Sequence, residues 1–544
     1  MTAGQAIHIP LQADGTSLAS GMYNYSVVVG LKYGATTINQ TFTGQQGIVN
    51  RASSEFGSGW WLSGLDRLVD SSAGALLVKG DGSFLWFPKT ASTYGHAAGD
   101  TDFNTLVKTE TNTFILTSKY GNVANFSTLG LLSSVVDTNS NTTSLTYADR
   151  NSNGVADELI SITDPFGRVT NLTYTSAKVS SITHFSGRTT TLAVSSGLLN
   201  SYTLTDPDGA GALVAPQFSF SYTSGALTSR TNPLSQITSF SYGANDGRLR
   251  SITYPNTPSN QVWSITPPEV IDLPTGATGN IVSTPISVQG TVVDERNSSW
   301  KFRTDRFGNL TDWITSLQFQ TTYSRDADGQ EIIKLLPDPD GSAGPLGLSI
   351  TLTGYNALGD LVYSQAPDNG ISTFVYSTTL HRLLSTTDPV GRTKSFTYST
   401  TGNQLTSTDG GGYVTTKVFN SRGLPTSIAS HDPDGAGALT APVTGLAYDS
   451  SGRVVTITNP DASTQTFTYN TADDRLTETD ELGKTTTSAC DSLGRLTSKT
   501  DRTGSATAQW ITAIMIPSGI PYHLDTRVIT INRAFRSSST PIIG

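Results

Sequence analysis

The stretch YDSSGRVVTITNPDASTQTFTYNTADDRL, residues 448–476, decides the fold because its pattern repeats along the chain. It runs from one aromatic residue through a glycine turn and an Asn-Pro turn to the next aromatic residue, 21 positions later. Such aromatic anchors recur at steps of 21, 22, 21, 29 and 21 residues, and Cys490 stands 21 positions after the last one. A fixed period in this range is typical of repeat architectures. The anchors are Tyr355, Tyr376, Tyr398, Phe419, Tyr448 and Tyr469.

Two kinds of turn signal stay in register with the anchors. A glycine turn such as Ser451-Gly452-Arg453 follows the anchor, and a turn that begins with Asp or Asn follows the next strand. Glycine supplies the positive φ that a tight reversal needs, and a proline after Asp presets φ for a turn. Each unit therefore predicts a strand, a glycine turn, a second strand and an Asp turn. The Asp or Asn markers are Asp388, Asp409, Asn459, Asp480 and Asp501.

The 29-residue step contains an inserted segment, DPDGAGALTAP at 432–442, and a near copy, DPDGAGALVAP, occupies 206–216. The two copies indicate that duplication built this region. The same succession of aromatic anchors and turns extends upstream, with less regular spacing. It is visible at Tyr147, Asp164-Pro165-Phe166-Gly167-Arg168, Tyr174, Tyr222, Tyr242 and Asp305-Arg306-Phe307-Gly308.

Aromatic residues alternate with Thr and Ser along the predicted strands, as at Phe467 and Tyr469. A period of two places each set on its own face of a sheet. A lone hairpin is at best marginally stable, so neighbouring hairpins must share a core. The sequence therefore predicts an all-β protein in which tandem hairpins form a spiralling, shell-like sheet that is open or partial. We divide the chain into an N-terminal β segment (1–50), a lead-in β region (51–130), the repeat array (131–510) with a Pro-rich interruption near 255–290, and a divergent tail (511–544).

Composition limits the partners of the chain. A net charge of −9 opposes attraction to a phosphate backbone, so nucleic acid is not an expected partner. The single cysteine excludes an intramolecular disulfide framework. The sequence contains no apolar run of about 20 residues, so we expect no membrane-spanning segment. The N-terminus shows no signal-peptide pattern.

The repeat residues resemble a known family. Tyr448-Asp449-Ser450-Ser451-Gly452-Arg453-Val454 and Asp491-Ser492-Leu493-Gly494-Arg495-Leu496 are similar to the Tyr-Asp (YD) repeat of the Rhs and teneurin-like proteins. FGSGWWLSGLDRLV (56–69), KGDGSFLWF (79–87) and GLLSSVVDTNSNTTSLTYADRNSNG (130–154) resemble the lead-in to the repeats of bacterial Rhs proteins. The resemblance covers about residues 50–510.

The resemblance implies a strand ribbon that spirals into a hollow shell, in secreted or surface-attached bacterial proteins and in animal adhesion receptors. In complete bacterial members, such a shell encloses a C-terminal toxin domain. The shell-closing segment of the family, with its self-cleavage aspartates, has no matching residues in this sequence. No catalytic residue is therefore carried over.

One loop has the spacing of a calcium site. Asp149, Asn151, Asn153 and Asp157 stand at positions 1, 3, 5 and 9, with Gly154 at position 6. Position 12 is not a glutamate, although the neighbouring Glu158 could replace it. An Asn/Gly-rich hairpin tip produces the same string for turn reasons. Calcium is the one cofactor that the sequence suggests.

Trp60 and Trp61 lie in the densest aromatic cluster of the sequence, together with Phe56, Trp86 and Phe87. One interpretation is a platform on which a glycan stacks, and the other is a set of core residues, because tryptophan is usually buried. Cys490 replaces an anchor tyrosine, which favours a packing thiol over a nucleophile. The histidines are scattered and no nucleophile elbow is present, so we expect no enzyme activity.

The leading hypothesis is a non-enzymatic shell of a secreted or cell-surface YD-repeat protein, which encapsulates or presents a C-terminal passenger such as a toxin. The alternative is a carbohydrate-binding surface adhesin. The expected partners are accordingly a C-terminal passenger domain or a cell-surface receptor or glycan. An array that curls without closing leaves sheet edges unpaired, which predicts self-association.

Overall fold

The computed structural model describes residues 17–33, 36–209, 211–244, 247–256, 259–271, 287–305, 309–338, 344, 347–435, 437–500, 506–507 and 531–533. Over these residues the chain forms 43 β-strands and no helix, which confirms the all-β prediction. The described part therefore contains no helix that could cross a bilayer. Most of the divergent tail and the marker Asp501 lie outside the described residues.

The strands fall into four sheets. A two-stranded ribbon comes first, with β1 (Gly21–Tyr33) and β2 (Thr36–Ile48). The lead-in region holds β3 (Trp60–Leu62), which pairs with β43 (Ile531–Arg533), and a four-stranded sheet of β4 (Arg67–Asp70), β5 (Gly74–Val78), β6 (Phe84–Thr90) and β7 (Thr93–Tyr94).

All remaining strands form one large sheet. Its first part comprises β8 (Thr105–Lys108), β9 (Phe114–Thr117), β10 (Val123–Phe126), β11 (Leu132–Val136), β12 (Thr142–Ala148), β13 (Glu158–Thr163), β14 (Val169–Thr175), β15 (Lys178–Thr183), β16 (Thr189–Ser195), β17 (Leu198–Thr203), β18 (Gln217–Thr223), β19 (Ala226–Thr231), β20 (Ile237–Tyr242) and β21 (Leu249–Tyr254). Its middle comprises β22 (Gln261–Ile271), β23 (Ser287–Val293), β24 (Ser299–Thr304), β25 (Leu310–Ile314), β26 (Gln320–Arg325) and β27 (Glu331–Leu336). Its last part comprises β28 (Ser349–Tyr355), β29 (Leu361–Gln365), β30 (Ile371–Tyr376), β31 (Leu383–Thr387), β32 (Thr393–Tyr398), β33 (Gln404–Thr408), β34 (Val414–Phe419), β35 (Pro425–Ala429), β36 (Val443–Tyr448), β37 (Val454–Thr458), β38 (Thr464–Tyr469), β39 (Arg475–Thr479), β40 (Thr485–Cys490), β41 (Leu496–Thr500) and β42 (Ala506–Thr507).

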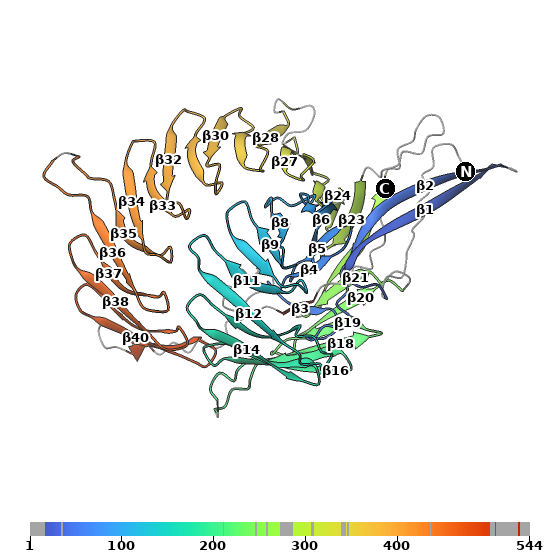
Figure 1. Cartoon of the computed structure of the whole chain (residues 1–544), viewed down its shortest axis with the longest axis horizontal. Coiled ribbons are helices and arrows are strands. Elements are labelled where there is room, and N and C mark those ends of the chain that lie inside the picture. The colour runs from blue at the N-terminus through green and yellow to red at the C-terminus, as the bar shows by residue number, and fades with distance from the viewer. Residues whose placement is uncertain are drawn as a thin grey trace.

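The large sheet is a strip that curls back on itself. Its strand order traces a closed ring, although every ladder of this large sheet whose register is described joins strands adjacent in the chain. Figure 1 shows the curl, with β11–β18 on one side and β30–β40 on the other. We call β9–β18 (residues 114–223) the first arm and β28–β41 (residues 349–500) the second arm. We predicted that the shell is open or partial. This prediction depends on the two ends of the array, and residues 501–505 and 508–530 at its C-terminal end lie outside the described residues.

The Pro-rich interruption does not end the sheet. The β22–β23 ladder continues on both sides of Pro267 and Pro268, and its register shifts between Thr266 and Glu269. Proline has no backbone N–H to donate, so it is tolerated at such an irregularity. The large sheet begins at Thr105, upstream of the boundary at 131 that we predicted for the array.

In seven of the described repeat units, an anchor tyrosine ties the hairpin to the preceding one. In each hairpin the register shifts immediately before the tyrosine, for example between Thr468 and Tyr469. The Tyr469 hydroxyl then donates to the carbonyl of Val454, at 2.9 Å. The tyrosine and its acceptor are 15 residues apart in regular units, and 23 apart for Tyr222 and Tyr448, whose units carry the duplicated insertions. The same bond is made by Tyr147, Tyr174, Tyr242 and Tyr398.

We expect Tyr469→Phe to destabilise the β37–β38 hairpin by about 1 kcal/mol, because the substitution leaves the half-buried Val454 carbonyl without its hydrogen bond. Tyr413→Phe is the matched control, since Tyr413 is 57% exposed. Hydrogen exchange of the peptides that span 454–479 measures the effect. Equal exchange rates in the two variants would show that the hydroxyl bond contributes nothing.

The five-residue turns explain the Asp and Gly markers. In Asp449–Arg453, one carboxylate oxygen of Asp449 accepts from the backbone N–H groups of Ser451 and Arg453, at 2.9 and 3.0 Å. Gly452 has a φ of +75°, which a residue with a side chain adopts at a cost. The Arg453 side chain closes the turn on the second Asp449 oxygen, at 2.7 Å. Asp164, Asp388 and Asp491 make the same set of bonds with an arginine four positions on.

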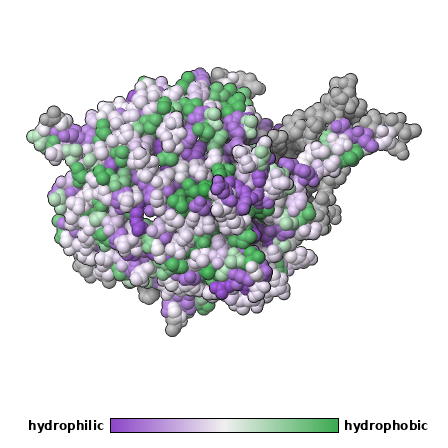
Figure 2. Space-filling model, viewed as in Figure 1, coloured by the Kyte–Doolittle hydropathy of each residue, from purple (hydrophilic) through white to green (hydrophobic). Residues whose placement is uncertain are grey.

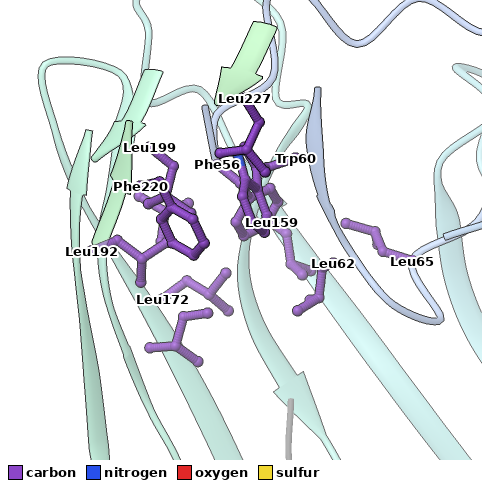
Figure 3. Packing of buried hydrophobic residues seen from close by; sticks show 12 residues of the cluster. Phe56, Trp60, Leu62, Leu65, Leu159, Leu172, Leu192, Leu199, Phe220 and Leu227 are labelled. Atoms are coloured by element: carbon purple, nitrogen blue, oxygen red, sulfur yellow. The ribbon is translucent and has the colours of Figure 1, made fainter. Parts of the chain in front are cut away.

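A lead-in segment, residues 51–65, fills the concave side of the first arm. Its Phe56, Trp60, Leu62 and Leu65 are buried against the inward side chains of β13–β19 (Figure 3). Those strands contribute Leu159, Leu172, Val179, Ile182, Leu192, Leu199, Phe220 and Leu227. We call residues 51–65 the inserted segment. The aromatic face of the first arm therefore faces inward, and the Thr/Ser face is on the outside.

Candidate functional site: the seam between the two arms

The two arms of the sheet meet through their turns, and we call this line of contacts the seam. The contacts follow the same order along both arms. Lys119 lies against Leu358 and Gly359, Asn139 against Asn403, Arg188 against Asp474, and Pro207 against Ser492. Because residues more than 230 positions apart meet in order, the seam holds one revolution of the strip against the next. Its turns are 118–122, 137–141, 164–168 and 184–188 on the first arm, and 356–360, 399–403, 420–424, 449–453, 470–474 and 491–495 on the second.

Side chains of the first arm occupy the space beside the turn glycines of the second arm. A Cβ added to Gly452 would lie 2.4 Å from the Phe166 ring, and one on Gly423 would lie 2.5 Å from the Asn139 amide. By contrast, a Cβ on Gly391 or Gly483, which lie in the other turns of the second arm, would meet nothing within 4 Å. The seam glycines are thus required for their small size as well as for positive φ. Arg188 of the first arm lies beside Gly494 in the same way, and Phe103, just upstream of that arm, lies beside Gly359.

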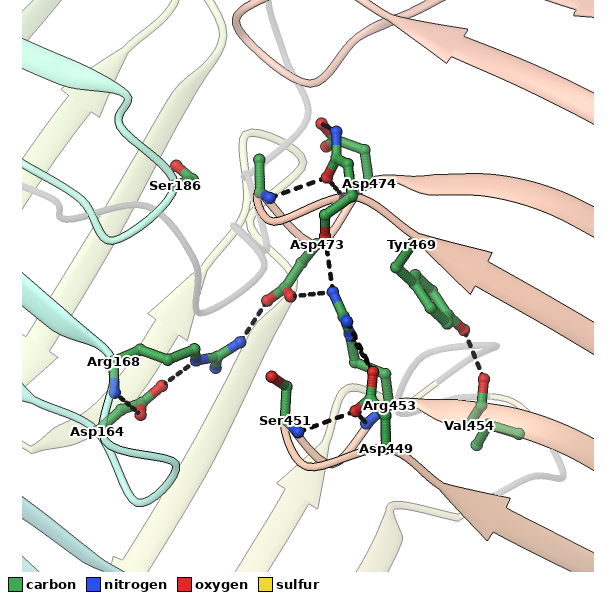
Figure 4. A network of polar contacts seen from close by, with 12 residues as sticks. Asp164, Arg168, Ser186, Asp449, Ser451, Arg453, Val454, Tyr469, Asp473 and Asp474 are labelled. Atoms are coloured by element: carbon green, nitrogen blue, oxygen red, sulfur yellow. Dashed lines mark hydrogen bonds and ion pairs between the residues drawn. The ribbon is translucent and has the colours of Figure 1, made fainter.

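An ion network lies at the centre of the seam (Figure 4). Asp473 of the second arm binds Arg168 of the first arm at 2.5 Å and Arg453 of its own arm at 2.8 Å. Asp164 and Asp449 hold the other sides of the two guanidinium groups, at 2.6 Å each. Burial acts to raise the pKa of Asp449, but the hydrogen bonds from Arg453 hold that pKa below its usual range. Three carboxylates match two guanidinium groups, so the network fastens the arms and leaves no cationic site for an anion.

Arginine also fixes the aromatic residue of the seam. The Arg168 guanidinium lies 5.3 Å from the centre of the Phe166 ring, and Arg422 of the second arm lies 4.8 Å from it. Arg422 also donates to the carbonyl of Pro165, at 3.1 Å. A ring held by two cations has little freedom to move away from Gly452. Further along, both oxygens of Asp474 accept from one Arg188 nitrogen, at 2.8 and 2.7 Å.

The first contact of the seam is the most buried. The Asp360 carboxylate bonds to the His381 ring at 2.7 Å and lies 3.6 Å from the Lys119 ammonium. All three side chains are less than 9% exposed. Lys119 also donates to the Gly359 carbonyl at 3.0 Å. Each polar group of this cluster has a partner, so the cluster stabilises the junction and offers no open site for a substrate.

Trp60 is part of the core. Its side chain is 6% exposed, its ring lies 4.7 Å from that of Phe220, and its N–H donates to the Tyr222 hydroxyl at 2.9 Å. The Trp61 N–H donates to the carbonyl of Leu65 at 2.6 Å, and the Arg51 guanidinium lies 5.1 Å from its ring. Trp60 therefore has no face open to a sugar in this structure. The predicted glycan platform would need the inserted segment to leave the sheet.

Backbone hydrogen bonds also hold the inserted segment on the first arm. Val179 donates to the Glu55 carbonyl at 3.0 Å, and Ser58 donates to that of Gly197 at 2.7 Å. Burial, with a smaller contribution from the charge of Glu158, raises the pKa of the Glu55 side chain from 4.5 to about 7. The Lys178 ammonium donates to the Ser54 carbonyl at 2.7 Å.

The predicted calcium loop is an exposed tip between β12 and β13. Asp149 accepts from the N–H groups of Asn153 and Gly154, and Asn151 and Glu158 are hydrogen-bonded to each other. One Asp157 carboxylate oxygen is buried without a hydrogen-bond partner. Within the described part of the chain, no group of three or more His, Cys, Asp or Glu side chains could hold a metal ion. The loop bonds are those of a turn, and calcium binding stays a prediction.

Calcium titration of the full chain tests this prediction. If Asp149, Asn151, Asn153 and Asp157 bind the ion, isothermal titration will show heat at millimolar or lower calcium, within the range of extracellular sites. Asp149→Asn is then expected to weaken binding by at least about tenfold, because it removes a charged ligand. Asp461→Asn, in an exposed turn of the second arm, is the matched control. Absence of heat in the wild type would leave the loop as a turn alone.

Cys490 occupies an anchor position opposite Leu496. Burial raises the pKa of its thiol above the usual value, and the charges of Asp474 and Asp491 act in the same direction. A raised pKa keeps the sulfur protonated at neutral pH and therefore a poor nucleophile. These facts favour the packing role that the sequence indicated.

Two family models match the sequence. Residues 110–266 match the teneurin YD-shell model, and residues 448–481 and 469–506 match the RHS repeat model. No curated protein matches the chain.

Solved structures resemble the chain weakly. The Tc holotoxin pore of Photorhabdus luminescens shares 12% sequence identity with a TM-score of 0.38, and the match covers 86% of this chain and 24% of that one. TcdB2-TccC3-TEV shares 11% identity with a TM-score of 0.36, over 88% of this chain and 29% of that one. The chain thus spans less than a third of the length of these structures. The two sequence matches, with the tyrosine anchors and Asp turns that they cover, identify residues 110–266 and 448–506 as segments similar to the YD-repeat (RHS-repeat) proteins.

Proposed function

We propose that the chain is the non-enzymatic shell portion of a secreted or cell-surface YD-repeat protein, and that it encloses or presents a C-terminal passenger such as a toxin. The observation that carries this proposal is the seam. Ladders between successive strands give only a long strip, whereas turn-to-turn bonds between its two arms convert the strip into a wall around an interior.

The chemistry of the described residues supports a structural role. At Asp360 and Asp473, the buried polar side chains form ion pairs with one another. A catalytic group needs access to a substrate and a partner that shifts its reactivity. The outer surface carries polar and apolar residues interspersed over the face in Figure 2, which suits a solvated wall. We infer the extracellular location from the resemblance to secreted and surface-attached YD-repeat proteins.

The adhesin alternative gains no support from the tryptophan cluster, since Trp60 is buried and the Trp61 N–H is already bonded. Glycan-array binding of the full chain would still be the direct test of that alternative. Binding that depends on Trp61 but not on Trp313, which is 41% exposed, would favour it.

Protease protection of a passenger tests the shell. A protease-sensitive reporter fused after Gly544 is expected to be cleaved at least about tenfold more slowly than the same reporter alone, because an enclosed chain is inaccessible to the protease. Arg188→Ala combined with Phe166→Ala removes two seam contacts and should restore cleavage. Arg392→Ala, whose side chain is 72% exposed outside the seam, should not. Equal cleavage of the fused and the free reporter would contradict the proposal.

A further inference from the structure

The β1–β2 ribbon stands apart from the curled sheet and extends away from it (Figures 1 and 2). It forms a sheet of its own, with 13 residues in each strand and an unbroken antiparallel register from Gly21↔Ile48 to Tyr33↔Thr36. A two-stranded ribbon is at best marginally stable in water, because each strand satisfies only half of its backbone groups and one layer buries little surface.

The base of the ribbon is fixed. Asn50 donates to the Leu18 carbonyl at 2.6 Å and to the Ser20 hydroxyl at 2.9 Å. A Cβ on Gly47 would lie 2.3 Å from the Phe84 ring, so this ring of the lead-in sheet packs directly on the backbone. The ribbon therefore projects from a defined attachment to the lead-in region.

Within the residues that the structure describes, neither outer edge of the ribbon carries the usual protection against pairing. In the described residues no third strand joins β1 or β2. Natural edge strands are usually blocked by charges, prolines or bulges. Residues 21–48 contain no proline and a single charged residue, Lys32, and the ladder has no register shift. An edge with these properties is a template for another strand.

The β1 strand is complementary to itself. Its odd positions, among them Tyr23, Tyr25, Val27 and Val29, share the half-buried face of the ribbon, and Val27 lies opposite Phe42. If two copies of β1 pair antiparallel about a twofold axis at Val27, every residue of the strand, from Gly21 to Tyr33, has a partner in the second copy. Residues of equal parity then face each other, so the apolar faces of the two ribbons become continuous. The lone charge, Lys32, would face Met22 of the second copy, so no like charges meet.

We propose that the chain forms a twofold dimer in which β1 pairs edge to edge with β1 of a second copy, giving a four-stranded sheet centred on Val27. The interface is isologous and closes at two copies. It differs from the self-association that the sequence suggested, since it uses the isolated ribbon and not the edges of the repeat array. It does not depend on whether the shell encloses a passenger.

Sedimentation of the full chain tests the dimer. Wild type is expected to sediment in a concentration-dependent manner, up to twice the 57.5 kDa of one chain. Val27→Lys and Val27→Glu each place like charges directly opposite at the axis and should weaken the dimer by at least about tenfold. An equimolar mixture of the two variants pairs Lys with Glu, so dimer formation should return.

Val28→Lys is the matched control. Val28 is 60% exposed on the other face of the ribbon and would oppose Ser26 of the second copy, so this variant should dimerise like wild type. A wild type that remains monomeric at every concentration would overturn the proposal. Failure of the mixed Val27 variants to dimerise, when each ribbon is folded by hydrogen exchange, would overturn the twofold register.

Discussion

Gly452→Ala is expected to destabilise the second arm by about 2–4 kcal/mol, the sum of backbone strain and overpacking. Gly452 has a φ of +75°, and its missing Cβ would lie 2.4 Å from the Phe166 ring. The ring cannot withdraw without leaving Arg168 and Arg422. The new methyl group must therefore push the two arms apart at the centre of the seam.

Gly483→Ala separates the two causes. Gly483 also has a φ of +75°, yet a Cβ there would meet nothing within 4 Å. This control should cost only the strain, about 1–2 kcal/mol. Urea unfolding followed by hydrogen exchange of 118–188 and 449–495 reports both stability and seam opening. The double variant Phe166→Ala/Gly452→Ala should recover part of the loss, whereas equal losses for Gly452→Ala and Gly483→Ala would contradict the seam contact.

Trp60→Ala is expected to cost about 3–5 kcal/mol, the usual range for deleting a buried tryptophan side chain. The substitution removes the packing on Phe220 and leaves the Tyr222 hydroxyl without its indole partner. The inserted segment should then detach from the first arm. Limited proteolysis is expected to cut within residues 51–65 of the variant and to leave this segment intact in the wild type.

Trp313→Ala is the control for the loss of a tryptophan as such. The Trp313 side chain is 41% exposed, so its removal should cost less than about 1.5 kcal/mol. Thermal unfolding of the two variants measures the difference. If Trp60→Ala is as stable as Trp313→Ala, the inserted segment does not contribute to the core of the first arm.

The sequence predicts the local structure well because each marker has a local physical reason. Tyr469 marks the bulge that carries its hydroxyl to Val454, and Asp449 with Gly452 closes a five-residue turn through bonds inside that turn. The duplicated insertions leave this arrangement intact, since Tyr448 still reaches Pro425. Period, strand faces and turn types therefore follow from residues that are close in sequence.

The seam could not be predicted in the same way. Arg168 and Asp473 are 305 positions from one another along the chain, and their contact depends on how tightly the strip curls. Curvature is the summed effect of small twists at many strands, and no single residue encodes it. One signal was present in DPFGR at 164–168, where an aromatic residue, Phe166, occupies the turn position that is Val390, Ser451 or Leu493 in the other Asp-Arg turns. The burial of Trp60 likewise depends on the fold of distant strands, so the sequence left two interpretations open.

The most direct test of the account is a cross-link across the seam. The Asn139 and Asn403 side chains exchange hydrogen bonds of 2.7 and 3.3 Å, although 264 positions separate them in sequence. The full chain with Cys490→Ser, Asn139→Cys and Asn403→Cys should be joined rapidly within one molecule by a short bismaleimide. The pair Asn139→Cys and Ser463→Cys, which places the second thiol in an exposed turn outside the seam, should not. Rapid intramolecular cross-linking of the first pair alone is the predicted result, and equal, slow reaction of both pairs would contradict a sheet that curls back on itself.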